Sequence, residues 1–388
     1  MPDVAIVGAG PVGLLLGLLL RRRGIEVLII EQRTRRSGHT RAIGIHPPAL
    51  AALEDAGVAQ ELIAAGTRIT AGRALSGGRE VARLAFSAVP GRHPFVLAVP
   101  QPVTERILRE HYLAAGGQII EGVRIVSAYD AGTRVSLCGR HADGTAAQPG
   151  PVGNSGGPVR IDAALAIGAD GARSTVAAAV GAIPRSRSYP DTYLMGDFAD
   201  TTGEPGTALL FLERDGIVES FPLPAGIRRW VVRTRQLQPP GAVELAELVR
   251  RRTGIRIEAD SNSMLSAFAV QSRLVRRMVT GRITLIGDAA HEISPIGGQG
   301  MNLGWLDAAA LAPIIAGALA GEPAAGALRR FEQTRRRAAA VAAAQAHLNM
   351  ALGRPLPPPL LAARNRALSA ALGHPRAGQL VARRFTMH

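Results

Sequence analysis

Cysteine is nearly absent from this chain of 388 residues, and lysine is missing altogether. With Cys138 as the one cysteine, a disulfide within the chain, a dithiol redox pair and a thiolate metal cluster are all excluded. Any electron transfer by this protein therefore requires a bound cofactor, and we expect no metal site.

Because lysine is missing, the 45 basic residues are all arginines, and they give a formal net charge of +15. These arginines are scattered rather than gathered in one block. Aromatic residues, which stack on nucleobases, make up only 4% of the chain. We therefore expect no nucleic-acid partner, although an arginine-rich nucleic-acid-binding protein stays as the alternative from a different class. The positive charge also favours the approach of an anionic nicotinamide cofactor.

Long apolar runs are missing as well. No uninterrupted stretch reaches the roughly 18 residues that a membrane span requires. The apolar run Val12–Leu20 is followed by Arg21–Arg23, whereas a signal peptide carries its positive charge before the apolar part. We expect a cytoplasmic protein without a membrane span. Its length is ample for two intimately joined domains.

The first residues that carry chemistry form a dinucleotide-binding pattern. A β-branched run, Val4–Val7, leads into Gly8-Ala9-Gly10-Pro11-Val12-Gly13 and a predicted helix, Pro11–Arg23. In this pattern the first glycine permits a tight turn, the second lets the backbone approach a pyrophosphate, and the third lets the helix pack on the strand.

Glu31 follows the next predicted strand, Glu26–Ile30, with Gln32 beside it. A carboxylate at this position accepts from a ribose 2′-hydroxyl and repels a 2′-phosphate. The site therefore suits the adenosine of FAD or NAD rather than that of NADP.

A second nucleotide-type site lies near the other end of the chain, in GRITLIGDAAHEISPIGGQGMNL. An acceptor-only carboxylate suits a polyol, glycines let backbone N–H groups approach a planar ring, and the following helix directs its positive end at that ring. Such a site stabilises the negative charge of a reduced flavin. Its candidate cofactor-binding residues are Gly287, Asp288, Pro295, Gly298, Gly300, Met301 and Asn302. Two such sites at opposite ends of the chain indicate FAD, a long cofactor held at both ends.

Two segments between these sites add candidates with two interpretations each. Arg41 reads either as a contact to a cofactor phosphate or the flavin edge, or as a solvated arginine before a helix. His46 is a substrate-facing or a structural histidine. Gln101 and Arg106 lie at the start of the predicted helix Pro102–Ala115, and each is interpreted as a cofactor contact or as a capping residue.

Asp170-Gly171-Ala172-Arg173-Ser174 forms the third motif between the two sites. Gly171 lets the backbone pass a ligand, and Asp170 is included among the cofactor-binding candidates. Arg173 is a candidate for the phosphates of a nicotinamide cofactor, and Ser174 is able to cap the next helix. A plain helix-capping turn is the alternative.

Changes in residue pattern along the chain predict where its strands, loops and helices lie. Leu209–Thr234 reads as three strands at hairpin spacing, an antiparallel meander inserted in an otherwise α/β chain. Cys138–Pro158 reads as a surface loop, and Ile161–Ala169 as one buried strand. The predicted helices are Pro47–Gly57, Val58–Gly66, Leu303–Ala320, Pro323–Asn349 and, after a break at Pro357–Pro359, Arg364–Arg384.

Three motifs, GAGPVG with Glu31, GADGARS and GDAAHEISPIGGQGMN, resemble in their order those of the FAD-dependent aromatic hydroxylases, the p-hydroxybenzoate hydroxylase-like monooxygenases. RAIGIHPPALAAL and VPQPVTERIL are most similar to the branch that acts on aromatic polyketides and phenylpropionates. The resemblance spans roughly Asp3–Asn349. It implies an α/β fold with a Rossmann-like FAD-binding domain (GR2 type), an inserted, mainly antiparallel β-sheet substrate domain, and C-terminal helices.

We accordingly predict a discontinuous FAD-binding domain over 1–70, 98–182 and 276–350, and a substrate domain over 71–97 and 183–275. A C-terminal helical segment over 351–388 follows. Many members of that branch carry a thioredoxin-like domain after the FAD-binding part, and the chain is expected to lack it.

The resemblance also implies an activity. NADPH or NADH binds transiently and reduces FAD, O2 adds at flavin C4a, and one oxygen atom passes to an aromatic or polycyclic substrate by hydroxylation or epoxidation. Pro295 is expected beside the reacting face and Arg41 at the flavin edge, which makes both catalytic candidates. An FAD-dependent reductase or dehydrogenase on the same scaffold is the main alternative, and a monomer or homodimer is expected.

Overall fold

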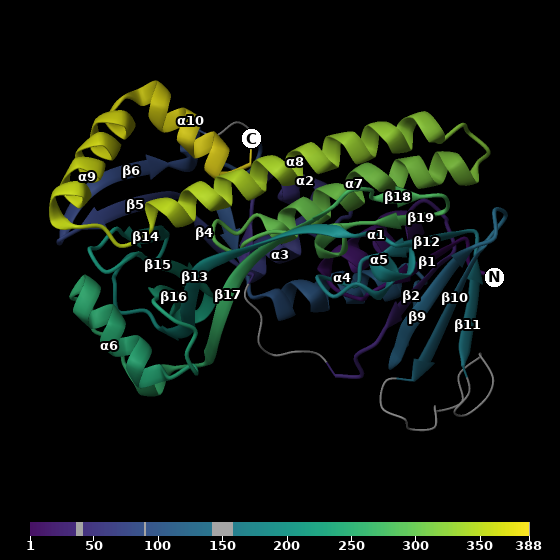
Figure 1. The fold of residues 1–388 in the computed structure, drawn as a ribbon, viewed down its shortest axis with the longest axis horizontal. Helices are drawn as coiled ribbons and strands as arrows, with labels where there is room; N and C mark the ends of the chain where they lie inside the picture. The colour runs from purple at the N-terminus through teal and green to yellow at the C-terminus, as the bar shows by residue number, and fades with distance from the viewer. Residues whose placement is uncertain (36–41, 89–90, 142–157, 388) are drawn as a thin grey trace.

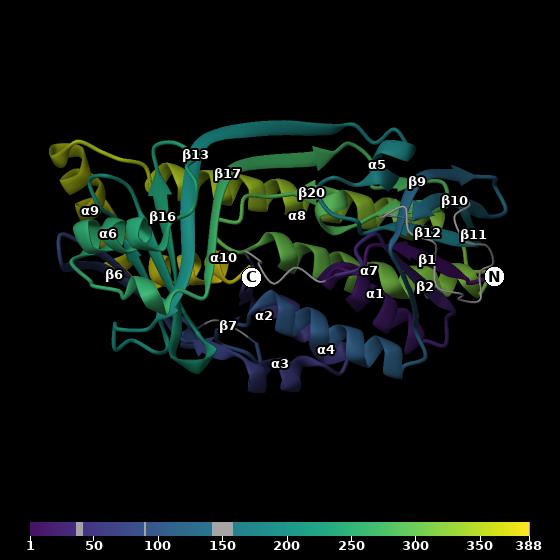
Figure 2. The same ribbon diagram turned by 90° about the horizontal axis from the view of Figure 1, so that it is seen from below.

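The computed structural model describes residues 1–35, 42–88, 91–141 and 158–387. The molecule is elongated, with a parallel sheet towards the N-terminus and a larger, mainly antiparallel sheet at the other end (Figure 1). Long elements connect the two ends, namely helix α8 (Ala325–Leu352) and strands β13 (Pro184–Ala199) and β17 (Met264–Val275) (Figure 2).

The sheet near the N-terminus has six strands, all parallel except β18 at its edge. In spatial order they are β18 (Val279–Thr280), β19 (Ile283–Leu285), β12 (Leu165–Gly168), β1 (Val4–Val7), β2 (Val27–Glu31) and β8 (Gln118–Glu121). The central strands are buried on both faces, which explains their continuous apolar runs. Beside this sheet, α1 (Pro11–Arg21) packs against both α4 (Gln101–Ala114) and α7 (Gly300–Leu319).

The segment predicted as one buried strand, Ile161–Ala169, is instead two strands of two different sheets. β11 (Val159–Ala163) pairs antiparallel with β10 (Val135–His141), which also pairs with β9 (Val123–Asp130). β12 pairs in parallel with β1. The chain changes partners at Ala164, in an apolar run without a turn residue, so the local pattern carried no sign of the break.

The larger sheet has eight strands, and the predicted meander forms its middle. In spatial order they are β20 (His291–Glu292), β17, β13, β16 (Ile227–Thr234), β15 (Val218–Leu223), β14 (Thr207–Phe211), β5 (Ala71–Ser76) and β6 (Arg79–Ala85). β14, β15 and β16 pair antiparallel in sequence order, which confirms the three predicted strands. β5 joins β14 in parallel.

One face of this sheet is closed by α6 (Ala242–Thr253). Leu245 and Val249 of this helix belong to one buried cluster with Phe211 and Trp230, whose rings stack with centroids 6.1 Å apart. The opposite face of the sheet is therefore the one left to line a cavity.

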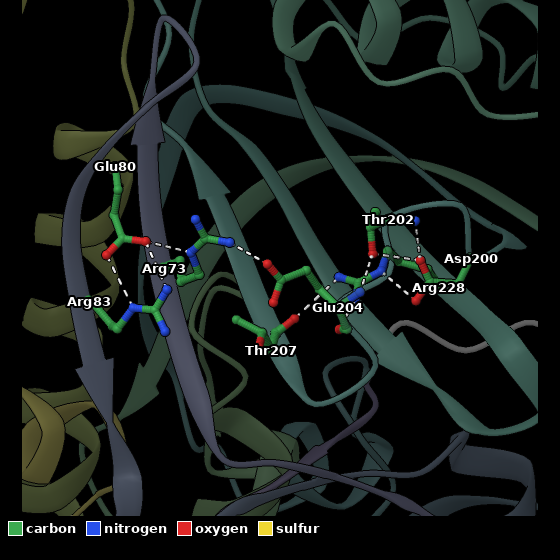
Figure 3. A network of polar contacts seen from close by, with 8 residues as sticks. All are labelled: Arg73, Glu80, Arg83, Asp200, Thr202, Glu204, Thr207 and Arg228. Atoms are coloured by element: carbon green, nitrogen blue, oxygen red, sulfur yellow. Dashed lines mark hydrogen bonds and ion pairs between the residues drawn. The ribbon is translucent and has the colours of Figure 1, made fainter.

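The edge formed by β5 and β6 is tied to the middle of the sheet by a network of ion pairs and hydrogen bonds (Figure 3). Arg73 on β5 contacts Glu80 on β6 at 2.6 Å and also Glu204 in the loop before β14. The fully buried Arg228 on β16 pairs with Asp200 at 2.9 Å and donates to the Glu204 carbonyl at 2.5 Å. This network fixes the loop 200–206 between β13 and β14 and holds the parallel β14–β5 pair in register.

A small sheet and two helices fill the space between the two main sheets. The small sheet has the order β3 (Gly44–Ile45), β7 (Val96–Ala98) and β4 (Thr67–Ile69). The helices α2 (Pro47–Asp55) and α3 (Ala59–Ala65) confirm the two predicted over 47–66, each ending one or two residues earlier than expected.

The C-terminal part departs from two expectations. The predicted helix Arg364–Arg384 is two helices, α9 (Pro358–Gly373) and α10 (Pro375–Phe385). The extended backbone of His374, which the following proline favours, separates them. The expected loop Cys138–Pro158 starts later than predicted because its first four residues belong to β10, and residues 142–157 lie outside the described part.

Helix α7 is long and apolar enough to cross a membrane by length and composition, with a mean hydropathy of 1.4 over its best window. The sequence-based expectation of no such stretch is therefore not met. Half of that window is buried inside the protein, and α7 packs against α1, α2 and α8. A buried Asp307 within it forms ion pairs with two neighbouring side chains. In this fold α7 is a core helix.

Candidate active site

One cavity of about 1030 Å³ extends from the turn after β1 to the inner face of the eight-stranded sheet. Its volume lies at the upper end of the roughly 300–1,000 Å³ that is usual for small-molecule sites. Residues from distant parts of the chain line it together, among them Gly10, Asp288, Gly298 and Phe385. Both glycine-rich segments singled out in the sequence therefore face the same cavity.

The turn between β1 and α1 leaves open space beside one glycine and packs protein atoms against the other two. Gly8 has φ +109°, and a Cβ on it would lie 2.4 Å from the Ala169 carbonyl oxygen. A Cβ on Gly13 would lie 2.1 Å from the Gly8 carbonyl oxygen. By contrast, nothing lies within 4 Å of the corresponding position on Gly10, which lines the cavity with Pro11 and Val12. This is the cradle that a pyrophosphate on a helix N-terminus requires.

Glu31 at the end of β2 braces this turn and lines the cavity. Its carboxylate accepts from the Ala9 N–H at 2.8 Å and from the Arg33 N–H and Nε at 2.9 Å. Burial alone raises the pKa of Glu31, but the hydrogen bonds from Arg33 and Ala9 outweigh it and hold the pKa below its ordinary value. The group is therefore an ionised acceptor at neutral pH. Gln32 lies on the same part of the wall.

The second glycine-rich segment forms a tight loop before α7. Gly297 and Gly298 have φ values of +97° and +66°, which favour glycine, and Pro295, Gly300 and Met301 line the cavity with them. α7 begins at Gly300 without a side-chain cap on its first N–H groups. The free N–H groups and the positive end of this helix thus lie at the cavity wall.

Asn302 is fully buried and does not line the cavity. Its Oδ1 accepts from the His46 N–H at 2.8 Å, and its Nδ2 donates to the carbonyls of Gly44 and Gly298 at 2.9 and 2.8 Å. This side chain clamps the loop before α7 to the strand β3. The Asn302 side chain therefore supports the loop from outside the cavity.

Asp288 follows β19 at the point where the cavity passes beneath the first turn of α7. Its carboxylate is accessible from the cavity but surrounded by protein, and this desolvation raises its pKa to about 6. The neighbouring Gly287, with φ +60°, packs against Val12 and does not line the cavity.

A buried cluster beneath Asp288 escaped the sequence analysis. Asp307 on α7 accepts from the Gly287 N–H at 2.9 Å and lies 2.6 Å from both His291 Nε2 and Arg335 Nε. Burial raises the pKa of Asp307, but the two cationic partners outweigh it and the pKa is lowered. Asp288 and His291 belong to one motif, and Asp307 follows it on the predicted helix, which was a signal that could have indicated a shared site.

The remaining candidates fall into three groups. Gln101, Asp170 and Gly171 line the cavity, but the Gln101 amide donates to Glu105 at 2.7 Å, and the Asp170 carboxylate caps α5 (Thr175–Ala179) through the Thr175 N–H at 2.7 Å. Arg106 lies outside the cavity and pairs with Glu110 at 2.7 Å. Arg41 lies outside the described residues.

The two candidates assigned to the third motif and to α2 also reach the cavity. Arg173 lines both this cavity and a neighbouring one of about 390 Å³ that Asp288 shares. His46 lines the main cavity beside Gly298 and meets the Phe385 ring edge-on, with ring centroids 6.1 Å apart. Ser174 caps α5 as predicted, accepting from the Ala177 N–H at 2.8 Å.

The far half of the cavity is apolar and is built by the eight-stranded sheet. One row of paired residues crosses the sheet and faces the cavity, with Leu210, Glu219, Val231, Met195 and Ser266 in order. Of the three aromatic residues on β14, β15 and β16, Phe221 lines the cavity, whereas Phe211 and Trp230 pack against α6 on the other face. Successive side chains of a strand point to opposite faces of the sheet, which separates these residues. Which of the two faces lines the cavity depends on the position of α6.

The C-terminal helices close this half of the cavity. Leu368 and Leu372 of α9 and Val381 and Phe385 of α10 line it, and the Phe385 ring stacks on Phe86 with centroids 5.7 Å apart. Figure 1 shows both helices lying over β5 and β6 at the end of the molecule away from the N-terminus. No sequence pattern in these helices predicted a role in the site.

Comparison with known proteins identifies the family. Residues 1–346 match the protein family described as FAD binding domain. The chain is 31% identical over 350 residues to rifampicin monooxygenase of Rhodococcus hoagii, which covers 88% of this chain and 69% of that protein. It is 33% identical over 319 residues to 6-methylpretetramide 4-monooxygenase of Streptomyces rimosus, covering 80% and 55%.

The fold recurs in solved structures. The p-nitrophenol 4-monooxygenase of Pseudomonas putida DLL-E4 superimposes with a TM-score of 0.88 at 21% identity, covering 99% of this chain and 97% of that one. The predicted fold class and family are thereby confirmed. The chain spans 55–69% of the length of four curated relatives that it matches.

Proposed function

Because this chain belongs to the FAD binding domain family, we propose that it is an NAD(P)H- and O2-dependent FAD monooxygenase of aromatic or polycyclic substrates. One observation carries the proposal: a single cavity joins the phosphate-binding turn, the loop before α7 and the apolar face of the larger sheet. A long cofactor and a flat apolar substrate fit end to end in such a space. When bound, FAD supplies the redox chemistry with NAD(P)H and O2.

The residues of the cavity fit FAD along its length. Gly10 and the start of α1 would hold the pyrophosphate, and Glu31 would accept from the adenosine ribose. Asp288 would accept from the ribityl hydroxyls. The N–H groups of the loop 297–300 would lie against the ring, where the positive end of α7 favours negative charge.

The substrate side of the cavity would hold an aromatic ring in a dry environment. Leu210, Met195, Val231 and Phe268 line it from the sheet, and Phe385 from α10. Exclusion of water there strengthens every polar contact made by the few charged side chains present. Pro295 lines the cavity, and its neighbour Ile296 packs with Met195 and Val231 of the sheet, which supports our proposal that Pro295 is the residue beside the reacting face.

Several finer assignments are also proposals. Arg41 is proposed at the flavin edge, and the division into an FAD-binding part over 1–70, 98–182 and 276–350 and a substrate part over 71–97 and 183–275 is proposed from the sequence. β20 from the first part joins the sheet of the second, so the two are closely interleaved. We further propose that the protein acts in the cytoplasm as a monomer or homodimer.

Oxygen incorporation tests the proposed function. The purified holoprotein would be screened with phenolic and polycyclic compounds for stimulated NADPH oxidation, and the products of 18O2 reactions would be weighed by mass spectrometry. One labelled oxygen atom per product molecule supports a monooxygenase. Turnover that does not need oxygen would favour the reductase or dehydrogenase. A colourless protein that cannot be loaded with FAD would overturn the proposal and favour the arginine-rich nucleic-acid binder.

A further inference from the structure

Glu219 is an acidic side chain placed in an apolar wall. It lies on β15, in the row that crosses the larger sheet, with Leu210 of β14 on one side and Val231 of β16 on the other. All three line the cavity, and the whole Glu219 residue is only 6% exposed. The next residues of the row, Met195 and Ser266, continue the wall.

The other carboxylates of the cavity are occupied or belong to the cofactor half. Glu31 is held by Arg33 and the Ala9 N–H, the Asp170 carboxylate caps α5, and the Glu292 carboxylate accepts from Gln271 at 3.0 Å. Among the described residues, Glu219 has no hydrogen-bond donor and no ion-pair partner. A buried carboxylate without a partner is costly, so its place in this wall requires a compensating role.

The wall around Glu219 faces the loop that precedes α7. Met195, Val231 and Phe268 belong to one buried cluster with Ile296 of that loop. Pro295 and Gly297, the neighbours of Ile296, line the same cavity. A ring that fills the space over Met195 and Val231 would therefore lie between the loop and the sheet, with Glu219 in reach of its polar substituent.

We propose that Glu219 binds the hydroxyl group of a phenolic substrate and accepts its proton during oxygen transfer. This inference rests on the proposed monooxygenase function. The phenolic O–H bond breaks, the proton forms a bond to a carboxylate oxygen of Glu219, and the electron pair stays on the phenol oxygen, which makes the ring a better nucleophile. After the oxygen atom has been added, the ring carbon releases its proton to water, and Glu219 returns its proton to the ring oxygen.

The surroundings of Glu219 suit this role. Burial raises its pKa to about 7, close to the value at which a general base works best near neutral pH. On the face of the sheet that carries Glu219, the nearby ionisable groups are Arg229 and Arg233 of β16 and Tyr193 and Asp197 of β13, whereas Arg228 lies on the other face. Arg229 is bound to Asp197 at 2.6 and 2.7 Å. Arg233 is likewise bound to Asp191 at 3.0 Å. These arginines therefore leave Glu219 free to act on a ligand.

The test uses the FAD-loaded protein with 2-naphthol and its methyl ether, 2-methoxynaphthalene, as probes. Binding is followed by the change in the flavin absorption spectrum, and oxygenated product by mass spectrometry. The native protein should bind the phenol at least tenfold more tightly than the ether. Glu219→Leu should remove this preference. Glu219→Gln, which accepts a hydrogen bond but no proton, should keep part of it and lose most product formation from 2-naphthol.

Met195→Leu is the matched control, because it alters the same wall without touching an ionisable group. It should change the binding of both probes alike. Equal affinity for the two probes in the native protein, a preference that survives Glu219→Leu, or no binding of either probe overturns the inference. If no aromatic compound gains oxygen from 18O2 in the native protein, the proposed function fails, whereas the binding preference still decides the role of Glu219.

Discussion

His291 Nε2 lies 2.6 Å from the Asp307 carboxylate, which also accepts from the Gly287 N–H at 2.9 Å. This contact fixes the end of β19 on the first turns of α7. Arg335 of α8 completes the cluster at 2.6 Å. All three side chains are at least nine-tenths buried, so the charges are paired away from water.

Asp307→Asn should destabilise the protein strongly, because it leaves the buried Arg335 and His291 without their carboxylate. The expected loss is about 3–5 kcal/mol, seen as a fall in Tm on the order of 5–10 °C. FAD should also dissociate faster, since Asp288 follows the anchored Gly287. Differential scanning calorimetry and the rate of flavin release measure the two effects.

Asp191→Asn is the control for this cluster. Asp191 is equally buried and bridges Arg233 and Arg354, at 3.0 and 2.7 Å, but does not line the cavity. The Asp191→Asn variant should lower Tm about as much as Asp307→Asn does, with little change in the rate of flavin release. Equal acceleration of flavin release in both variants would contradict the proposed anchoring of the cofactor site.

The affinity of the apoprotein for FAD should fall as the pH drops through 6. The ionised Asp288 accepts from ribityl hydroxyls, and below its pKa of about 6 the carboxyl is protonated and loses that capacity. One protonation predicts about a tenfold loss of affinity per pH unit well below this value. Titrations of FAD fluorescence from pH 4.5 to 8 measure it. Asp288→Asn should give a lower, pH-independent affinity, while Glu292→Gln should keep the pH dependence and shift it to lower pH, because the charge of Glu292 contributes to the raised pKa of Asp288.

Glu219→Gln should stabilise the protein at high pH. Burial raises the pKa of Glu219 from 4.5 in the unfolded chain to about 7 in the fold, so the stability present below pH 4.5 is lost as the pH rises through 7. The loss is on the order of 3 kcal/mol above pH 8. The variant should therefore melt several degrees above the native protein at pH 8.5 and close to it at pH 5. A constant difference at all pH values would show that ionisation of Glu219 is not the cause.

Phe385→Ala should uncouple NADPH oxidation from product formation. Phe385 stacks on Phe86 and lines the substrate half, so its removal opens the cavity to water. More hydrogen peroxide per NADPH is expected, with a loss of stability of about 3 kcal/mol. Leu380→Ala, on the exposed side of the same helix, should leave the ratio of product to NADPH unchanged. A peroxide assay alongside product analysis distinguishes the two variants.

The two ends of the cofactor site could be predicted because their chemistry is local. Gly8, Gly10 and Gly13 act through the backbone of one turn, and Asp288 and Gly298 belong to one loop next to a helix. Glu31 follows the strand next to that turn. In each case a short pattern predicts the local conformation and the position at the cavity, which the structure shows, while the role in binding the cofactor stays a prediction.

The substrate half could not be predicted because it depends on contacts across the sheet. Glu219 lies in an ordinary strand, and only the position of α6 decides that Trp230 packs beneath that helix while Glu219 faces the cavity. Nothing in the sequence of α10 indicates that Phe385 lines the same cavity as Gly8. Arg106 is a different case, since its i,i+4 spacing to Glu110 already favoured a surface ion pair.

The distance along the chain between Gly10 and Gly298 has a consequence for biogenesis. A ribosome releases the phosphate-binding turn first, and the ring-binding loop and its anchor Arg335 emerge only much later. A nascent chain therefore cannot hold flavin at both ends until the residues up to Arg335 have been made, and the vitamin-derived ligand stabilises only chains that have reached this point. In a flavin-starved cell, chains that have passed this point without flavin are the ones that lack this stabilisation against proteases.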